Sequence, residues 1–220
     1  MTTLTTQQVI DEGLSDWRVL IRTRILQACF ETGSFAVGAD LVAKITTVAE
    51  QLNHHPDVLL RYPHVLVTTT SHDVGGLTER DIALAQRISQ IAADLGIAAS
   101  PEKVGAQEIA IDALDIPAVR PFWQAVLGYA ANPADETELS DPMGRGATIW
   151  FQQMDAPRPQ RNRIHLDVSV PHDQAEARLQ ATLDAGGRLL SADAAPSFWV
   201  LADAEGNEAC ICTNLDREDG

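Results

Sequence analysis

Cysteine is scarce in this chain of 220 residues, and its placement argues against a disulfide-stabilised fold. Only three cysteines are present, and two of them, Cys210 and Cys212, stand two residues apart in a strand-like run. Small secreted domains that depend on disulfides carry many cysteines in a paired framework. We therefore expect reduced thiols, as in a cytosolic protein.

Basic residues and long apolar runs are also lacking. Lys and Arg number 16 against 31 Asp and Glu, which gives a formal net charge of −15. Binding to nucleic-acid phosphates or to an anionic membrane needs clustered positive charge, so the composition argues against both partners. No run approaches the ~20 apolar residues of a membrane span, and residues 1–8 lack the basic and apolar regions of a secretory signal. These absences predict a cytoplasmic protein.

A change of pattern near residues 98–105 divides the chain. A helical pattern ends at Leu95 and Gly96, a stretch of small and polar residues follows, and strand-like alternation begins at Gln107. We predict two domains, residues 1–100 and 105–220, each of ordinary domain size.

The first domain has the pattern of an α+β fold. Residues 17–30 alternate as one or two strands, and residues 65–70 form a β-branched strand. Apolar residues at three- and four-residue steps predict a helix over 35–53, and Thr78 followed by Asp81 resembles a capping box that opens a second helix. These elements predict an antiparallel sheet with helices on one face.

The second domain repeats itself. A strand at 108–113 is followed by a helix that Gly128 ends and by short strands up to residue 153. After a polar linker the order recurs, with a strand at 164–169, a helix over 173–185 and strands up to residue 213. Two strand–helix–three-strand units predict a pair of βαβββ modules with curved sheets.

Three of the six histidines, His54, His55 and His72, fall within one short stretch of the first domain. Imidazole titrates near neutral pH, so such a cluster can donate and accept protons in one reaction. Taken singly, a histidine is more often a surface or structural residue, and histidines at a helix C-terminus also favour the helix dipole. A zinc site is a weaker alternative, since adjacent residues point in different directions.

The combination of residues around these histidines is specific. An acidic residue stands four before a His-His-Pro triplet, an aromatic residue follows, and a third histidine leads through Gly-Leu-Thr to an aspartate. In order, these residues are Glu50, His54, His55, Pro56, Tyr62, His72 and Asp81. In this pattern the first domain resembles the pterin-4a-carbinolamine dehydratases, over roughly residues 17–93.

The resemblance implies loss of water from a 4a-hydroxytetrahydropterin, giving a quinonoid dihydropterin. It assigns acid–base roles to His54, His55 and His72, without saying which is the acid. Glu50 and Asp81 would orient imidazoles, and Pro56 and Tyr62 complete the motif. The resemblance implies a pterin substrate and a reaction that needs no cofactor. It is also compatible with a homo-oligomer.

The second domain resembles the glyoxalase-like domains of the vicinal oxygen chelate superfamily. The carrying features are the duplicated order of elements and the segments 122–129, 163–168 and 203–208. Members that use a metal place ligands at positions that here hold Glu108, His165 and Glu208, while the fourth position, near 150–152, offers no strong ligand. These three residues would hold a divalent cation or line a polar pocket, and the ligand of this domain stays open.

Two alternatives stand beside the dehydratase interpretation. In one, a metal-dependent isomerase, lyase or dioxygenase activity belongs to the second domain. In the other, the protein binds a pterin or another small molecule without catalysis. Metal content separates the first alternative from the dehydratase, and turnover of a carbinolamine separates the second.

Overall fold

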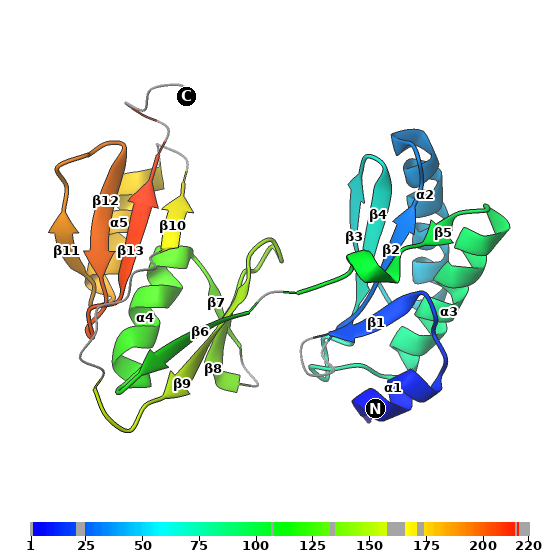
Figure 1. The fold of residues 1–220 in the computed structure, drawn as a ribbon, viewed down its shortest axis with the longest axis horizontal. Helices are drawn as coiled ribbons and strands as arrows, with labels where there is room; N and C mark the ends of the chain where they lie inside the picture. The colour runs from blue at the N-terminus through cyan, green and yellow to red at the C-terminus, as the bar shows by residue number, and fades with distance from the viewer. Residues whose placement is uncertain are drawn as a thin grey trace. The chain divides into compact units, whose positions relative to one another are not determined.

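The computed structural model describes residues 2–20, 25–106, 108–132, 135–157, 166–170, 174–213 and 215. The chain folds into two compact units, Met1–Ala106 and Gln107–Gly220 (Figure 1). Both units combine helices with β-sheet, which confirms the α+β class predicted from the sequence. Within these described ranges, none of the helices has the length and apolar character needed to cross a membrane.

The first unit is an antiparallel sheet with two long helices on one face (Figure 1). The strand order is β1-β2-β4-β3, and α1 precedes the sheet. The elements are α1 (Thr6–Asp11), β1 (Trp17–Leu20), β2 (Ile25–Glu31), α2 (Phe35–Leu52), β3 (Asp57–Arg61), β4 (His64–Thr69) and α3 (Glu79–Asp94).

The core of this unit lies between the sheet and the helices. Alternate residues of β2 and β4, among them Phe30 and Val67, are fully buried and meet apolar residues of α2 and α3 such as Leu41 and Ile88. Removal of this apolar surface from water is the main force that holds the layers together. Strand β3 was not predicted from the sequence; it pairs with β4, with Val58 and Leu60 directed to the core.

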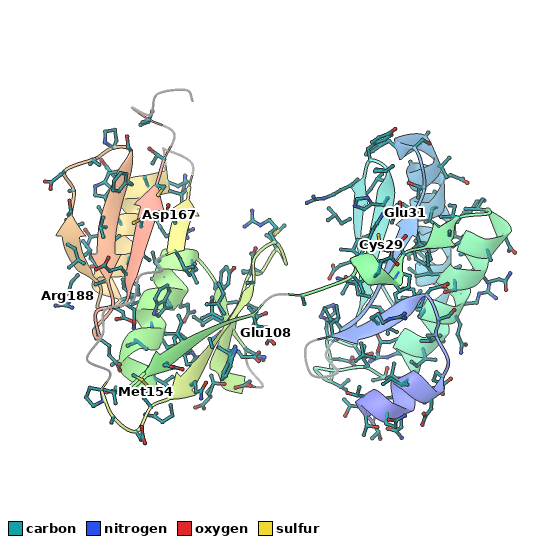
Figure 2. The ribbon with its side chains drawn as sticks, in the orientation of Figure 1. Cys29, Glu31, Glu108, Met154, Asp167 and Arg188 are labelled. Carbon is teal, nitrogen blue, oxygen red and sulfur yellow. The ribbon has the colours of Figure 1, made fainter. Side chains whose placement is uncertain are left out.

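Residues 98–105, expected to be a linker, fold back onto β2, and we call them the strap. Strand β5 (Ala98–Ala99) pairs with β2, and a 3₁₀ turn, η1 (Pro101–Lys103), follows. Ser100 N–H donates to the Cys29 carbonyl at 2.8 Å, and Lys103 Nζ lies 2.7 Å from a Glu31 oxygen (Figure 2). The strap therefore belongs to the first unit, which ends at Ala106.

The second unit consists of two sheets that repeat one topology. Strand orders are β6-β9-β8-β7 and β10-β13-β12-β11, and in each sheet the first and last strands of the module pair in parallel. The elements of the first module are β6 (Glu108–Ala113), α4 (Ile116–Leu127), β7 (Ala130–Asn132), β8 (Asp135–Ser140) and β9 (Thr148–Gln153). Those of the second are β10 (Leu166–Ser169), α5 (Ala175–Asp184), β11 (Arg188–Ser191), β12 (Phe198–Ala202) and β13 (Glu208–Cys212). The paired βαβββ modules are confirmed.

The two modules share one core and are joined by polar contacts, of which one is buried. Phe122 of the first module and Ile211 of the second belong to the same cluster of buried apolar residues. The Trp123 indole donates to the buried Asp203 carboxylate at 3.0 Å. The Glu205 carboxylate accepts the backbone N–H of Asp115 at 2.7 Å, at the start of α4. The second unit is therefore one folded body rather than two independent repeats.

Candidate functional site

The end of α2 determines where the first two histidines lie. The helix ends at Leu52, and Asn53 adopts the left-handed conformation, with φ 47° and ψ 44°. Asparagine tolerates this conformation better than most residues, and such a residue commonly ends a helix. The chain turns here, three residues before Pro56, and the His54 N–H donates to the Ala49 carbonyl at 3.1 Å.

His54 and His55 lie in opposite surroundings although they are adjacent. His54 is only 7% exposed, and its Nε2 atom is 2.8 Å from Oδ1 of Asp81. The His55 side chain is 55% exposed, and its Nε2 atom is 3.0 Å from Oε1 of Glu50, which is more exposed still. The structure thus separates a buried imidazole from one that a dissolved substrate can reach.

Asp81 is the centre of a buried polar network. Its side chain is fully buried, and its two oxygens accept hydrogen bonds from three different parts of the unit. Thr69, the last residue of β4, donates to Oδ1 at 2.8 Å; Ser71 donates to Oδ2 at 2.7 Å; and the Thr78 N–H donates to Oδ2 at 2.8 Å. The last of these bonds, with the reciprocal bond to the Thr78 side chain, confirms the predicted capping box of α3.

These contacts keep the Asp81 carboxyl ionised. Burial by itself would raise the pKa of Asp81, because a charge is poorly solvated inside the protein. Hydrogen bonds from His54, Ser71, the Thr78 N–H and Thr69 together outweigh this and hold the pKa of Asp81 below its usual value. With an ionised acceptor at Oδ1, the facing Nε2 atom of His54 carries the proton.

His72 lies in a tight turn between β4 and α3. The turn is closed by Ser71, whose N–H donates to the Gly76 carbonyl at 3.1 Å and whose carbonyl accepts the N–H groups of Val74 and Gly75. His72 itself is exposed. The next residue, Asp73, forms an ion pair with Arg80 of α3, and the Arg80 hydrogen bond lowers the pKa of Asp73.

The remaining residues of the motif are placed as follows. Pro56 directly precedes β3, and Tyr62 follows β3 with 72% of its surface exposed. Thr69 was not among the residues predicted for the site. Its signal in the sequence is the inward position that it holds in the alternation of β4, where a hydroxyl needs a partner.

The candidate ligands of the second unit are only partly visible. Glu108, labelled in Figure 2, begins β6 and is exposed. Glu208 begins β13 and is half-buried. His165 lies outside the described residues. Among the residues that are described, no three His, Cys, Asp or Glu side chains lie grouped as metal ligands. The described residues therefore do not by themselves assemble a set of metal ligands.

The cysteines and aromatic residues of this unit are mostly structural. Phe151 is buried in the core of the unit, and Trp199 packs against that core. Cys210 is buried in β13, where burial, followed by the neighbouring Asp167 carboxylate, raises the pKa of its thiol to about 11. Such a thiol is protonated at neutral pH and is a poor nucleophile.

Known proteins resemble the two units separately. The family model described as "Pterin 4 alpha carbinolamine dehydratase" matches residues 2–91, and that described as "Glyoxalase-like domain" matches residues 108–212. A protein of Cyanothece sp., named "Putative pterin-4-alpha-carbinolamine dehydratase", is 41% identical over 78 residues, which are 36% of this chain and 78% of that protein.

Two solved structures resemble one unit each. A transcriptional coactivator/pterin dehydratase from Brucella melitensis is 28% identical and covers 41% of this chain and 99% of its own, with a TM-score of 0.40. A glyoxalase-related enzyme from Fulvimarina pelagi is 20% identical and covers 50% of this chain and 88% of its own, with a TM-score of 0.41.

Proposed function

We propose that the first unit dehydrates a 4a-hydroxytetrahydropterin, because through this unit the chain belongs to the pterin 4 alpha carbinolamine dehydratase family. The observation that carries the proposal is the exposure of two imidazoles, His55 and His72, next to the buried network of Asp81. The second unit, a glyoxalase-like domain, has no assigned ligand.

The reaction needs one proton donor and one proton acceptor. Hydroxide leaves C4a poorly, so an imidazolium gives its proton to the C4a hydroxyl as the C–O bond breaks and water departs. The lone pair of N5 forms the C4a–N5 double bond, and a neutral imidazole takes the N5 proton. No electrons are exchanged with a cofactor, and the protein ends with the same number of protons. Imidazoles suit both steps because their pKa lies near neutral pH.

Within the proposal, the three histidines have different roles. His55 and His72 are the acid–base pair, because both are exposed. The Glu50 carboxylate lies 3.0 Å from the Nε2 atom of His55 and orients the ring. His54 was expected in the same catalytic set; its burial against Asp81 supports a positioning role instead.

Stopped-flow decay of a 4a-hydroxytetrahydropterin, corrected for its spontaneous dehydration, tests the proposal. Wild type should exceed the spontaneous rate, and His55→Ala and His72→Ala should each slow the enzymatic step by roughly 10²–10⁴-fold, the usual worth of a positioned acid or base. His64→Ala, at a half-buried position of β4 outside the motif, is the control. A wild type no faster than the spontaneous reaction would instead favour the non-catalytic binding protein.

A further inference from the structure

The residue that precedes each exposed histidine is bound to the same carboxylate. His54 precedes His55 and contacts Oδ1 of Asp81 at 2.8 Å, while Ser71 precedes His72 and contacts Oδ2 at 2.7 Å. The two contacts use different oxygens, so they form at the same time. Asp81 thereby joins two segments that are separated along the chain, the C-terminus of α2 and the turn after β4.

Both attachments are buried and leave little freedom. His54 is 7% exposed, Ser71 is 1% exposed and Asp81 is 0% exposed. Ser71 is held from several sides, since its hydroxyl lies 2.8 Å from that of Thr78 and its N–H is bonded to Gly76. Adjacent Cα atoms are about 3.8 Å apart, so holding residues 54 and 71 limits how far the Cα atoms of His55 and His72 can move.

We infer that Asp81 is a positioning residue that sets the separation of His55 and His72 by holding His54 and Ser71. This inference rests on the proposed function, in which His55 and His72 move the two protons. Two protons must be transferred at fixed atoms of one substrate, so an error of about 1 Å in the spacing of the imidazoles is costly in rate, up to roughly 10²-fold. A carboxylate is suited to this role because it accepts several hydrogen bonds at once.

We call the hydrogen-bonded set of His54, Ser71 and Asp81 the brace. Its sharpest test is the contact of Ser71 with Asp81, because Ser71 is neither an acid nor a base in the proposed reaction. Ser71→Ala removes one hydrogen bond to Asp81 and should lower kcat roughly tenfold, with KM changed by less than about twofold, since the loss is one of orientation. Ser71→Thr keeps the hydroxyl and should restore most of the rate. A Ser71→Ala kcat equal to wild type would overturn the inference.

Ser89→Ala is the matched control. The Ser89 hydroxyl accepts a hydrogen bond from the Trp17 indole at 3.0 Å in the same unit, without touching Asp81. This variant loses one partly buried side-chain hydrogen bond and should keep the kcat of wild type. An equal loss of kcat in both variants would mean that general destabilisation, not the brace, lowers the rate, and would also overturn the inference.

Ring-proton NMR of the full chain separates this inference from the proposed function. Ser71→Ala should shift or broaden the His72 resonances and, through Asp81, those of His55, whereas Ser89→Ala should shift neither. If wild type lacks dehydratase activity but the resonances respond in this way, the proposed function fails and the brace stands. If wild type is active but neither histidine responds to Ser71→Ala, the brace fails and the proposed function stands.

Discussion

The imidazole of His54 and the carboxylate of Asp81 form a buried pair, with 2.8 Å between Nε2 and Oδ1. His55, one residue further, is solvent-exposed. Two neighbouring histidines of one motif therefore differ in their surroundings: His54 is buried against Asp81, and His55 is open to solvent. This difference leads to a direct comparison of the two positions.

His54→Ala should destabilise the first unit, and His55→Ala should not. His54→Ala removes a hydrogen-bond partner of the buried Asp81 carboxylate and should lower the free energy of unfolding by about 2–3 kcal/mol. His55→Ala is a substitution on the surface and should change the free energy of unfolding by less than about 0.5 kcal/mol. Hydrogen exchange of the β4 amides measures this within the first unit. Equal protection in the two variants would contradict the burial of His54.

The Asp81 pair also predicts a dependence of stability on pH. The folded-state pKa of Asp81 is lowered, so its contribution is present above the unfolded value of about 3.9 and is lost as pH falls through the folded-state value. Asp81→Asn should therefore be less stable than wild type at pH 7, by about 1–3 kcal/mol, and the difference should narrow below pH ~4. Asp94→Asn, an exposed change at the end of the same helix, is the control.

The thiols should be unreactive in the folded protein. Cys29, Cys210 and Cys212 are buried and none of them is in a disulfide. Burial is the main cause that raises the pKa of the Cys29 thiol, and the pKa of the Cys210 thiol is raised to about 11. Titration with an aromatic disulfide reagent at pH 8 should show little reaction before unfolding and three thiols per chain in denaturant. Fast reaction of a thiol in the native protein would show that the structure around that thiol opens to the reagent.

Metal binding by the second unit is expected to be weak. Glu108, His165 and Glu208 supply at most three ligands, and the strand segment expected to provide a fourth holds Trp150 and Gln152. After dialysis, we expect the protein to retain well below one divalent ion per chain, as measured by inductively coupled plasma emission spectrometry. A stoichiometric ion that His165→Ala removes would support the metal-dependent alternative instead.

The sequence predicted what depends on local pattern and missed what depends on distant partners. The long helices and β4 follow from apolar periodicity and from the Thr78–Asp81 capping box. Strand β3 was missed because it is short and lies at the edge of its sheet. It also stands between Pro56 and Pro63, and these prolines indicate turns more strongly than the short alternation of residues indicates a strand. The burial of His54 was missed because its partner lies 27 residues away.

The strap was missed for a related reason. Its residues are small and polar, as in a linker, and only the pairing of Ala98 and Ala99 with β2 makes them part of the sheet. The motif histidines could be found from sequence because they form a compact pattern, whereas the contact of Gly105 N–H with the Gln27 side chain, at 3.2 Å, joins residues with no common motif.

The strap also determines which fragment should be chosen to express the first unit by itself. A fragment that ends at residue 91, where the match to the family model ends, would lose the pairing of β5 with Phe30 and Glu31 of β2. It would also lose the hydrogen bond from the Ser100 N–H to the Cys29 carbonyl. The shortest fragment that contains the whole first unit is instead residues 1–106. Any protein joined after residue 106 would begin next to Gly105, whose N–H donates to the Gln27 side chain at 3.2 Å.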